Sequence, residues 1–388
     1  MGPRRGPRIQ LPDTAAATTE PIDPARNGEA SKGAPAERSL GPQALPDHPG
    51  RAAHEQRQAA TMDAIVQDGY GSSDILRLAQ VPRPQVGLHD VLLAVRAAGL
   101  DRGTWHLMAG KPRLLRLAFG LRTPKQPIIG RDVAGTVVEV GAQVTAFRVG
   151  DEVFGVASGS VAEYAAARAD KLARRPANVT WEQAAVVPVS GGTALQAVLD
   201  AGGVTAGQQA LVTGASGGVG SYAVQLAKSA GAEVTGTASA AKHDLLRSVG
   251  ADHVLDYERD DFADGSRHYD LIIDIAGLSD LARLRRALTP TGTLVLVGGE
   301  GGGDWTGGTM GRQLRARLAS LFSRQRLTSV LAKERGSDYE RLAVLLESGE
   351  LVPSIDRAYP IAGTAAAMRH LESGAVRGKV AITVGALG

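Results

Sequence analysis

The sequence predicts an α/β protein that combines a β-rich segment with a doubly wound parallel sheet. Short apolar runs follow one another closely over residues 64–156, and apolar runs then alternate with helix-like stretches over residues 193–299. Glycine is frequent, at 49 of 388 residues, while aromatic residues make up only 4%. This composition suits tight strand-to-helix turns better than an aromatic-rich β-sandwich.

Composition also excludes several classes of protein. The 43 basic and 40 acidic residues leave a net charge of +3, too small a field for nucleic acid to be the main partner. No apolar run is long enough to cross a bilayer, so we expect no stable membrane insertion. The chain has no cysteine, which excludes disulfides, thiolate-bound zinc, iron–sulfur clusters and a cysteine nucleophile.

Residues 1–61 are predicted to be a disordered tail. They are rich in Pro, Ala, Arg and Gly, with few large apolar residues and no periodicity. Arg4 and Arg5 precede no apolar stretch, which favours a solvated tail over a secretion signal. Met62 opens the first ordered segment and is a candidate start of the compact protein, with the upstream stretch either an appendage or the product of a misplaced start codon.

The β-rich segment follows, from Met62 to Pro188. Apolar runs separated by Gly, Pro and Asp predict four strands, at residues 64–66, 91–100, 133–141 and 151–156. Strands in such quick succession indicate a small barrel-like domain.

The pattern changes after Pro188 to alternating strands and helices. Strands are predicted at residues 210–214, 233–239, 253–257, 269–277 and 292–299, and helices at 193–202, 219–232, 242–251 and 281–290. Such alternation is typical of βαβ units in a parallel sheet. Beyond a glycine-rich loop at 298–308, we predict a basic helix at 311–327, helices around 340–349 and 365–374, and a last strand at 379–384.

The strongest motif is ALVTGASGGVGSYAVQLAKSAGA at residues 210–232. A buried strand leads into Ala215-x-Gly217-x-x-Gly220 and then a helix, so the dinucleotide fingerprint is present with alanine in its first position. Small residues allow close approach to a pyrophosphate, and the helix N-terminus offers free N–H groups. The predicted cofactor-binding turn comprises Ala215, Ser216, Gly217, Gly218, Val219 and Gly220.

The end of the next strand favours NADPH over NADH. An acid usually binds the ribose hydroxyls of NAD there, but this strand ends Gly236-Thr237-Ala238-Ser239 and is followed by Lys242. Ser239 and Lys242 could hold a 2′-phosphate through charge-assisted hydrogen bonds. The alternative is that Lys242 is a solvated first-turn residue.

With these motifs in place, the chain resembles the zinc-independent medium-chain dehydrogenase/reductases, in particular their NADPH:quinone oxidoreductase (zeta-crystallin-like) branch. The matching stretches, in family order, are AAGLDRGTWHLMAG, GRDVAGTVVEVG, GDEVFG, GGTALQAV, GASGGVG, LLRSVGADHVLDY and GKVAITV. The resemblance covers about five-sixths of the chain. It implies a GroES-like catalytic domain at 62–188 completed by 325–388, a Rossmann NADPH-binding domain at 189–324, an active site in the cleft and a homodimer.

The resemblance also bears on zinc. Zinc alcohol dehydrogenases of this superfamily use Cys, His-Glu and Cys as catalytic ligands, and those positions hold Asp101, Arg131-Asp132 and about Val189 here. An arginine cannot ligate zinc, so we predict no metal. Asp101 and Asp132 could together hold another metal, but two carboxylates without histidine make a poor transition-metal site. The alternative is that both form structural hydrogen bonds.

Further site residues are implied by the resemblance. His106 lies where many relatives have an active-site tyrosine, and Asp101 lies where they often have Asn. His106 either donates a hydrogen bond to the substrate oxygen or forms a pocket wall beside Trp105. Thr193 corresponds to a position near the nicotinamide. The remaining candidates match cofactor-binding positions of relatives. Gly298 and Gly299 match positions beside the carboxamide, and Lys379 matches a residue that reaches the cofactor from the C-terminal segment. Tyr257 matches a position that flanks the adenosine phosphate; the alternative is that it is a surface aromatic.

These features predict a cytoplasmic, NADPH-dependent oxidoreductase that reduces quinones, enones or related activated double bonds. Oxidising a simple alcohol needs an alkoxide, which a metal normally stabilises, whereas an activated acceptor needs mainly hydrogen bonds to its oxygen. Two alternatives stay open: an NADP-dependent alcohol dehydrogenase or aldehyde reductase, and a non-catalytic NADPH-binding protein. The basic helix at 311–327 either covers the cleft, packs between domains or touches an anionic membrane.

Overall fold

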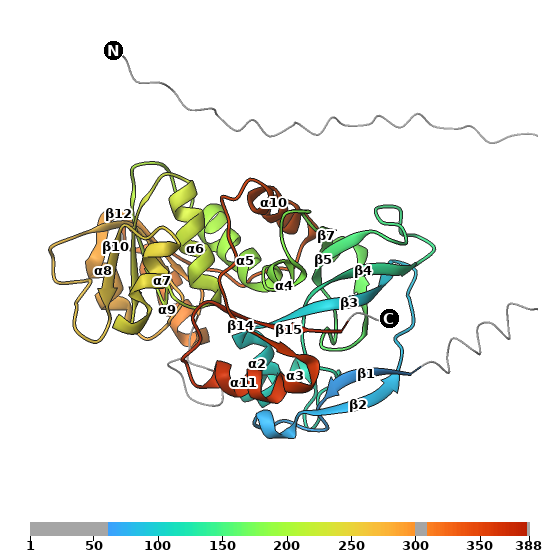
Figure 1. Ribbon diagram of the computed structural model, residues 1–388. Coiled ribbons are helices and arrows are strands. Elements are labelled where there is room, and N and C mark those ends of the chain that lie inside the picture. The colour runs from blue at the N-terminus through green and yellow to red at the C-terminus, as the bar shows by residue number, and fades with distance from the viewer. Residues whose placement is uncertain (1–60, 299–308, 386–388) are drawn as a thin grey trace, which may run out of the picture. The chain divides into compact units, whose positions relative to one another are not determined.

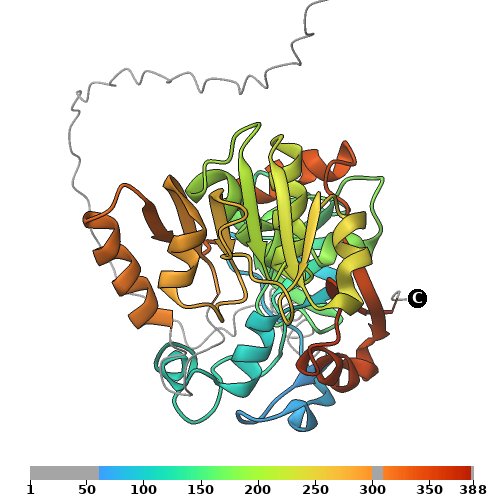
Figure 2. The same ribbon diagram turned by 90° about the vertical axis from the view of Figure 1, so that its left-hand side faces the viewer.

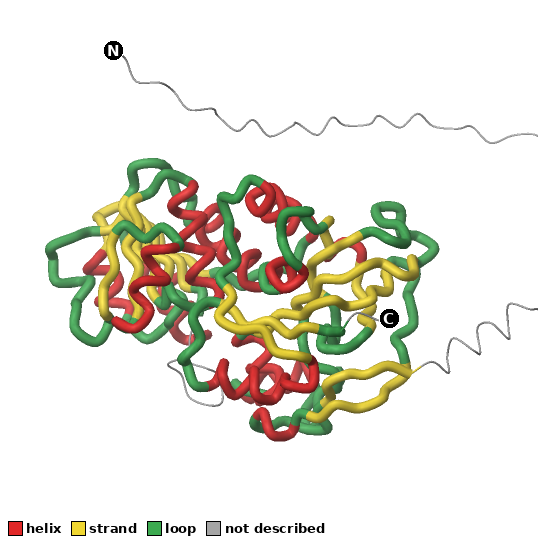
Figure 3. Tube along the Cα trace, viewed as in Figure 1, coloured by secondary structure: helices red, strands yellow, loops and turns green. Residues whose placement is uncertain are grey.

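The computed structural model describes residues 61–298 and 309–385, the side chains of residues 309 and 310 excepted. Residues 1–60 of the predicted tail and residues 299–308, which include Gly299 and most of the glycine-rich loop, lie outside the described residues. Thr61, the last residue of the predicted tail, begins a strand. The described strands form a two-stranded ribbon, a seven-stranded sheet and a six-stranded sheet. Figure 3 shows these strands gathered in separate groups between helices and loops. The predicted α/β class is confirmed.

The seven-stranded sheet is the β-rich part of the molecule. Its order is β14-β15-β3-β4-β5-β7, with β6 also paired to β3, and all its pairs except β14–β15 are antiparallel. Its strands are β3 (Asp90–Leu100), β4 (Asp132–Val140), β5 (Glu152–Val156), β6 (Tyr164–Arg168), β7 (Leu172–Arg174), β14 (Ile355–Pro360) and β15 (Lys379–Thr383). The ribbon pairs β1 (Thr61–Val66) with β2 (Arg77–Pro82).

The last strand of the chain completes this sheet from a distant part of the sequence. In β15, Val380 pairs with Leu100 of β3, and Figure 1 shows β15 and β14 beside β3. The sequence places residues 379–384 in a strand but gives no sign of β14, whose side chains are mostly exposed and lack a regular apolar pattern.

The six-stranded sheet is parallel throughout, with order β10-β9-β8-β11-β12-β13 (Figure 2). Strands β8 to β12 run at Gln209–Thr213, Glu233–Ala238, His253–Asp256, Tyr269–Asp274 and Leu288–Leu296, and β13 at Arg326–Ser329. Four of the five residues of β8 are buried, because the central strand of a doubly wound sheet is covered on both faces. Since β13 pairs with β12, this sheet extends past the predicted domain limit at residue 324.

Helices connect and cover the two large sheets. The α-helices are α2 (Arg102–Ala109), α3 (Arg116–Phe119), α4 (Trp181–Ala185), α5 (Pro188–Leu195), α6 (Gly218–Ser229), α7 (His243–Ser248), α8 (Leu281–Ala287), α9 (Thr309–Leu321), α10 (Gly336–Glu347) and α11 (Thr364–Glu372). A π-helical turn, η4 (Gln196–Ala201), follows α5, and short 3₁₀ turns lie at η1 (Ser73–Ile75), η2 (Arg113–Leu115), η3 (Ala169–Lys171), η5 (Ala240–Lys242) and η6 (Ile361–Gly363). None of the helices in the described part of the chain is both long and apolar enough to span a bilayer.

The basic helix differs from its prediction. It ends at Leu321 rather than 327, because Leu327 pairs with Leu294 in the parallel sheet and this pairing overrides the helical pattern. Its buried Ala316 packs with the apolar cluster of that sheet. Leu314 and Leu318 on the same helix are exposed.

Candidate active site

The predicted cofactor-binding turn connects β8 to the first turn of α6, with Gly217 as the N-cap. A Cβ added to Gly220 would lie 2.2 Å from the Gly214 carbonyl oxygen, so glycine is needed there for the helix to pack on the turn. Gly217 has an ordinary φ of −83°, and a Cβ there would approach nothing closer than 3.5 Å. The space beside Gly217 is therefore open to a ligand, as a pyrophosphate requires.

Ser239 and Tyr257 lie at the carboxyl ends of adjacent parallel strands. Ala238 of β9 pairs with Asp256 of β10, so the two residues that follow these strands share one edge of the sheet. Tyr257 is 58% exposed. This arrangement suits the adenosine end of a dinucleotide.

Lys242 is not the freely solvated side chain of the alternative interpretation. Its Nζ donates to the carbonyl oxygens of Gly374 at 2.6 Å and Val376 at 2.8 Å. Burial of the ammonium lowers the pKa of Lys242. Two of its three N–H donors therefore hold the segment between α11 and β15, and one remains for a ligand.

Gly298 follows β12 at the same edge of the sheet. A Cβ there would lie 1.9 Å from the carbonyl oxygen of Ile275, which follows β11, so the two strand ends can approach this closely only with glycine.

Lys379 lies beneath the glycine turn, where its carbon chain packs against Gly218: a Cβ on Gly218 would lie 2.8 Å from Lys379 Cδ. Its Nζ donates to Ser190 Oγ at 2.9 Å and lies 3.3 Å from Asp132 Oδ2. The side chains of Lys379 and Asp132 are 1% and 0% exposed. This buried pair joins the seven-stranded sheet to the cofactor turn.

Asp132 also binds the first turn of α5, since its Oδ1 accepts from the backbone N–H of Val189 at 2.8 Å. Burial raises the pKa of Asp132 to about 7, with the Asp101 charge adding to the rise and Lys379 opposing it. Thr193, further along α5, donates its hydroxyl to the Val189 carbonyl oxygen at 2.6 Å.

Asp101 and His106 have local partners in and after α2. Asp101 caps the helix, because its Oδ1 accepts from Thr104 N at 2.7 Å and from Thr104 Oγ1 at 3.0 Å. His106 Nδ1 lies 2.8 Å from the Lys111 carbonyl oxygen, and its ring meets Trp105 edge-on. The neighbouring residues Thr104 and Leu107 line the cavity described next, whereas His106 does not.

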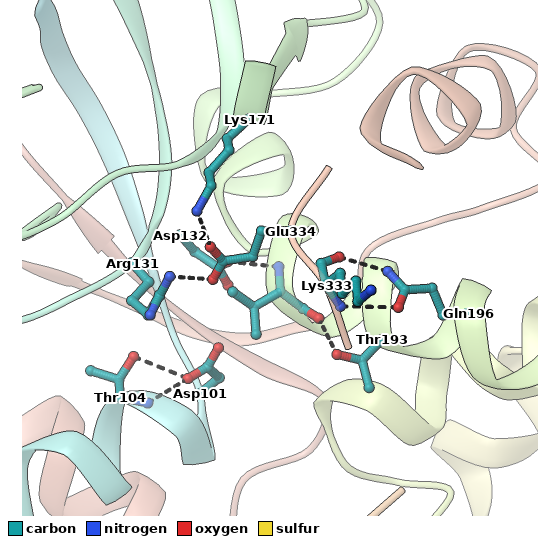
Figure 4. A network of polar contacts seen from close by, with 10 residues as sticks. Asp101, Thr104, Arg131, Asp132, Lys171, Thr193, Gln196, Lys333 and Glu334 are labelled. Atoms are coloured by element: carbon teal, nitrogen blue, oxygen red, sulfur yellow. Dashed lines mark hydrogen bonds and ion pairs between the residues drawn. The ribbon is translucent and has the colours of Figure 1, made fainter. Parts of the chain in front are cut away.

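A cavity of about 520 Å³ opens beside these residues. Its lining is largely apolar, with Leu107, Met108, Phe119, Ile128 and Ile129 among the side chains. A cluster of charges lies at its wall: Arg131 pairs with Glu334, and Lys171 Nζ lies 2.9 Å from the other Glu334 oxygen (Figure 4).

Sequence reasoning missed this charged cluster. Arg131 entered only as a residue unable to bind zinc, although its place in the GRD motif was a usable signal. Glu334 is separated from Arg131 by 203 positions, and no motif marks it.

The donor set does not suit a metal. Within residues 61–298 and 309–385, no group of three or more His, Cys, Asp or Glu side chains is placed to hold an ion. Near the cavity, Asp101 is engaged by Thr104, and Asp132 by Val189 and Lys379.

Comparisons with known proteins agree with this architecture. The alcohol dehydrogenase GroES-like domain family matches residues 87–177, and the zinc-binding dehydrogenase family matches residues 249–382. The chloroplastic quinone-oxidoreductase homolog of Spinacia oleracea is 32% identical over 84% of this chain and 99% of its own. The NADPH-dependent alkenal/one oxidoreductase of Arabidopsis thaliana, also chloroplastic, is 31% identical over 83% of this chain and 79% of its own.

A solved structure extends the match to the whole fold. The quinone oxidoreductase from Coxiella burnetii has a TM-score of 0.74 and 29% identity, and the match covers 84% of this chain and 100% of that one. The chain therefore belongs to the medium-chain dehydrogenase/reductase superfamily, as an oxidoreductase of the quinone oxidoreductase and alkenal reductase type.

Proposed function

We propose that this protein uses NADPH to reduce quinones, enones or related activated double bonds without a metal. The observation that carries the proposal is the largely apolar cavity with Arg131 in its wall, next in sequence to the buried Asp132–Lys379 pair under the cofactor turn. The names of the quinone-oxidoreductase homolog and the alkenal/one oxidoreductase support this substrate class.

The residues divide into cofactor and acceptor groups. Residues 215–220 bind the pyrophosphate, Ser239 and Lys242 hold the 2′-phosphate, and Tyr257 flanks the adenosine. Thr193, Gly298 and Lys379 border the nicotinamide half. The bound cofactor supplies a hydride from C4 of its nicotinamide. The protein holds the acceptor in the apolar cavity and excludes water from it.

Asp101 and His106 play supporting parts in this proposal. Asp101 fixes the start of α2 through Thr104, and His106 fixes its end through Lys111. His106→Ala should therefore slow turnover without abolishing it.

An acceptor screen that follows oxidation of NADPH by absorbance tests the proposal. We expect kcat/KM with NADPH and a small quinone or enone to exceed that for a primary alcohol with NADP by at least about 100-fold, equivalent to roughly 2.7 kcal/mol. Efficient oxidation of ethanol or benzyl alcohol, with quinones and enones inert, would instead identify an alcohol dehydrogenase. Tight NADPH binding with no acceptor reduced would identify a non-catalytic binding protein.

We further propose a homodimer. The outer strand β13 of the parallel sheet is paired on one side only in the described structure, and Leu314, Leu318, Leu321 and Phe322 near it are exposed. A cytoplasmic location stays a prediction, which cell fractionation tests.

A further inference from the structure

Arg131 is held in place by a chain of ion pairs at the cavity wall. It pairs with Glu334, which in turn accepts from Lys171 at 2.9 Å. Figure 4 shows Arg131 and Lys171 reaching Glu334 from different directions. Two cations against one carboxylate leave this part of the wall with a net positive charge.

Arg131 also has an unused donor. Its Nε is buried and has no hydrogen-bond partner in the described structure. Leaving such a donor unsatisfied is unfavourable, so an acceptor atom that reaches it from the cavity would stabilise it.

Several other polar groups that line the cavity are already engaged, and the unpaired Oε1 of Gln67 can only accept a hydrogen bond. Thr104 donates its hydroxyl to Asp101, and Arg168 donates through Nε and Nη2 to Asp170. Lys125 donates to the Ala118 carbonyl oxygen. Arg131 is therefore the cation with a buried, unpaired N–H at this wall.

The backbone at Arg131 is tied to the cofactor side of the site. The next residue, Asp132, accepts from Val189 N in α5 and contacts Lys379, which packs under Gly218. A group on Arg131 is thus fixed relative to both the cavity and the cofactor turn.

We propose that Arg131 is a catalytic residue that binds the carbonyl oxygen of the acceptor and stabilises the negative charge that develops on it. The proposal rests on the function proposed above. For an enone, the hydride from NADPH forms a C–H bond at the β-carbon. The π pair of the Cα=Cβ bond then forms a double bond between Cα and the carbonyl carbon, and the π pair of the carbonyl group moves onto its oxygen. The resulting enolate takes a proton from water at Cα, and NADP⁺ is released. Glu334 and Lys171 are positioning residues for the guanidinium.

A dye titration tests Arg131 without any turnover. p-Nitrophenol, whose phenolate oxygen resembles that of the enolate, is titrated by absorbance while bound to the protein. With wild type, we expect its ionisation to shift to lower pH by about one unit, the effect of one charge-assisted hydrogen bond. Arg131→Met should abolish the shift and Arg131→Lys should keep part of it. Arg341→Met is the matched control. Arg341 lies on α10, pairs with Asp200 at 3.1 Å and does not line the cavity.

Steady-state kinetics with 2-cyclohexenone and NADPH form the second arm. Arg131→Met should lower kcat by about 100- to 1000-fold with a smaller change in KM, as for loss of an oxyanion-hole donor. Added guanidinium ion at low millimolar concentration should restore part of the rate to Arg131→Ala, but none to Gly217→Val. NADPH affinity and melting temperature should match those of Arg341→Met.

The outcomes separate the two proposals. An Arg131→Met variant with an unchanged dye shift, or with kcat within about threefold of an active wild type, overturns the role of Arg131. A wild type that reduces no acceptor overturns the proposed function instead, and the dye titration then still decides whether Arg131 holds an oxyanion.

Discussion

Lys379 Nζ lies 3.3 Å from Asp132 Oδ2 at a point where neither side chain reaches solvent. Removing one member of a buried ion pair leaves the other charge uncompensated, which costs more than the pair itself contributes. The two residues are 247 positions apart and belong to strands on either side of β3.

Lys379→Met should therefore destabilise the protein by about 3 kcal/mol at pH 8, where Asp132 is mostly ionised. Adding Asp132→Asn to this variant should recover part of the loss, because no unpaired charge remains. Urea unfolding measures both effects. The control is Lys228→Met, which breaks an exposed pair with Asp252 and should cost less than about 1 kcal/mol. Equal costs for the two lysines would contradict the buried pair.

Asp132 should make stability depend on pH. Burial raises its pKa to about 7 in the folded state, while the unfolded chain releases this proton near pH 4. Between these values the folded state binds more protons, so this carboxyl stabilises the fold at the acid end and the contribution is lost as pH rises. The unfolding free energy of wild type minus that of Asp132→Asn should fall from pH 4 to 7. A flat difference would rule out the raised pKa.

The two glycines of the cofactor turn should respond differently to substitution. Gly217→Val should fold normally yet lose NADPH binding, because the valine side chain enters open space that the pyrophosphate would occupy. Gly220→Ala should destabilise the fold by about 1–3 kcal/mol, because its Cβ meets the Gly214 carbonyl. Thermal melts and NADPH fluorescence titrations distinguish the two effects. Normal NADPH binding by Gly217→Val would place the cofactor elsewhere.

Lys242→Met should weaken NADPH binding by about tenfold and leave NADH binding nearly unchanged, because only NADPH carries the 2′-phosphate. Parallel titrations with both cofactors check this, with Lys228→Met as the control lysine. If both affinities fall together, Lys242 acts only by holding Gly374 and Val376.

Light scattering on a sizing column tests the homodimer. Leu318→Glu with Phe322→Glu should produce monomers, because both exposed side chains lie near the outer strand β13. Val344→Glu, on an exposed position of α10, is the control and should remain dimeric. A wild type that elutes as a monomer would refute the proposal directly.

Local patterns predicted the parallel sheet well, since alternating strands and helices and the Gly217–Gly220 turn depend on neighbouring residues. What they could not predict are contacts between distant segments. The partner of Arg131 lies 203 positions away, and Lys242 reaches carbonyls 132 and 134 positions away. Such pairs appear only once the sheets bring separate parts of the chain together.

The pairing of β15 with β3 also sets the order in which the two sheets can form during synthesis. Strand β3 leaves the ribosome well before residues 379–383, which pair with one of its edges. The parallel sheet has all its strands by residue 329 and can form first, because domains generally fold as units during synthesis. Until residues 379–383 have been made, β3 carries an open edge, and an open strand edge exposes a nascent chain to aggregation.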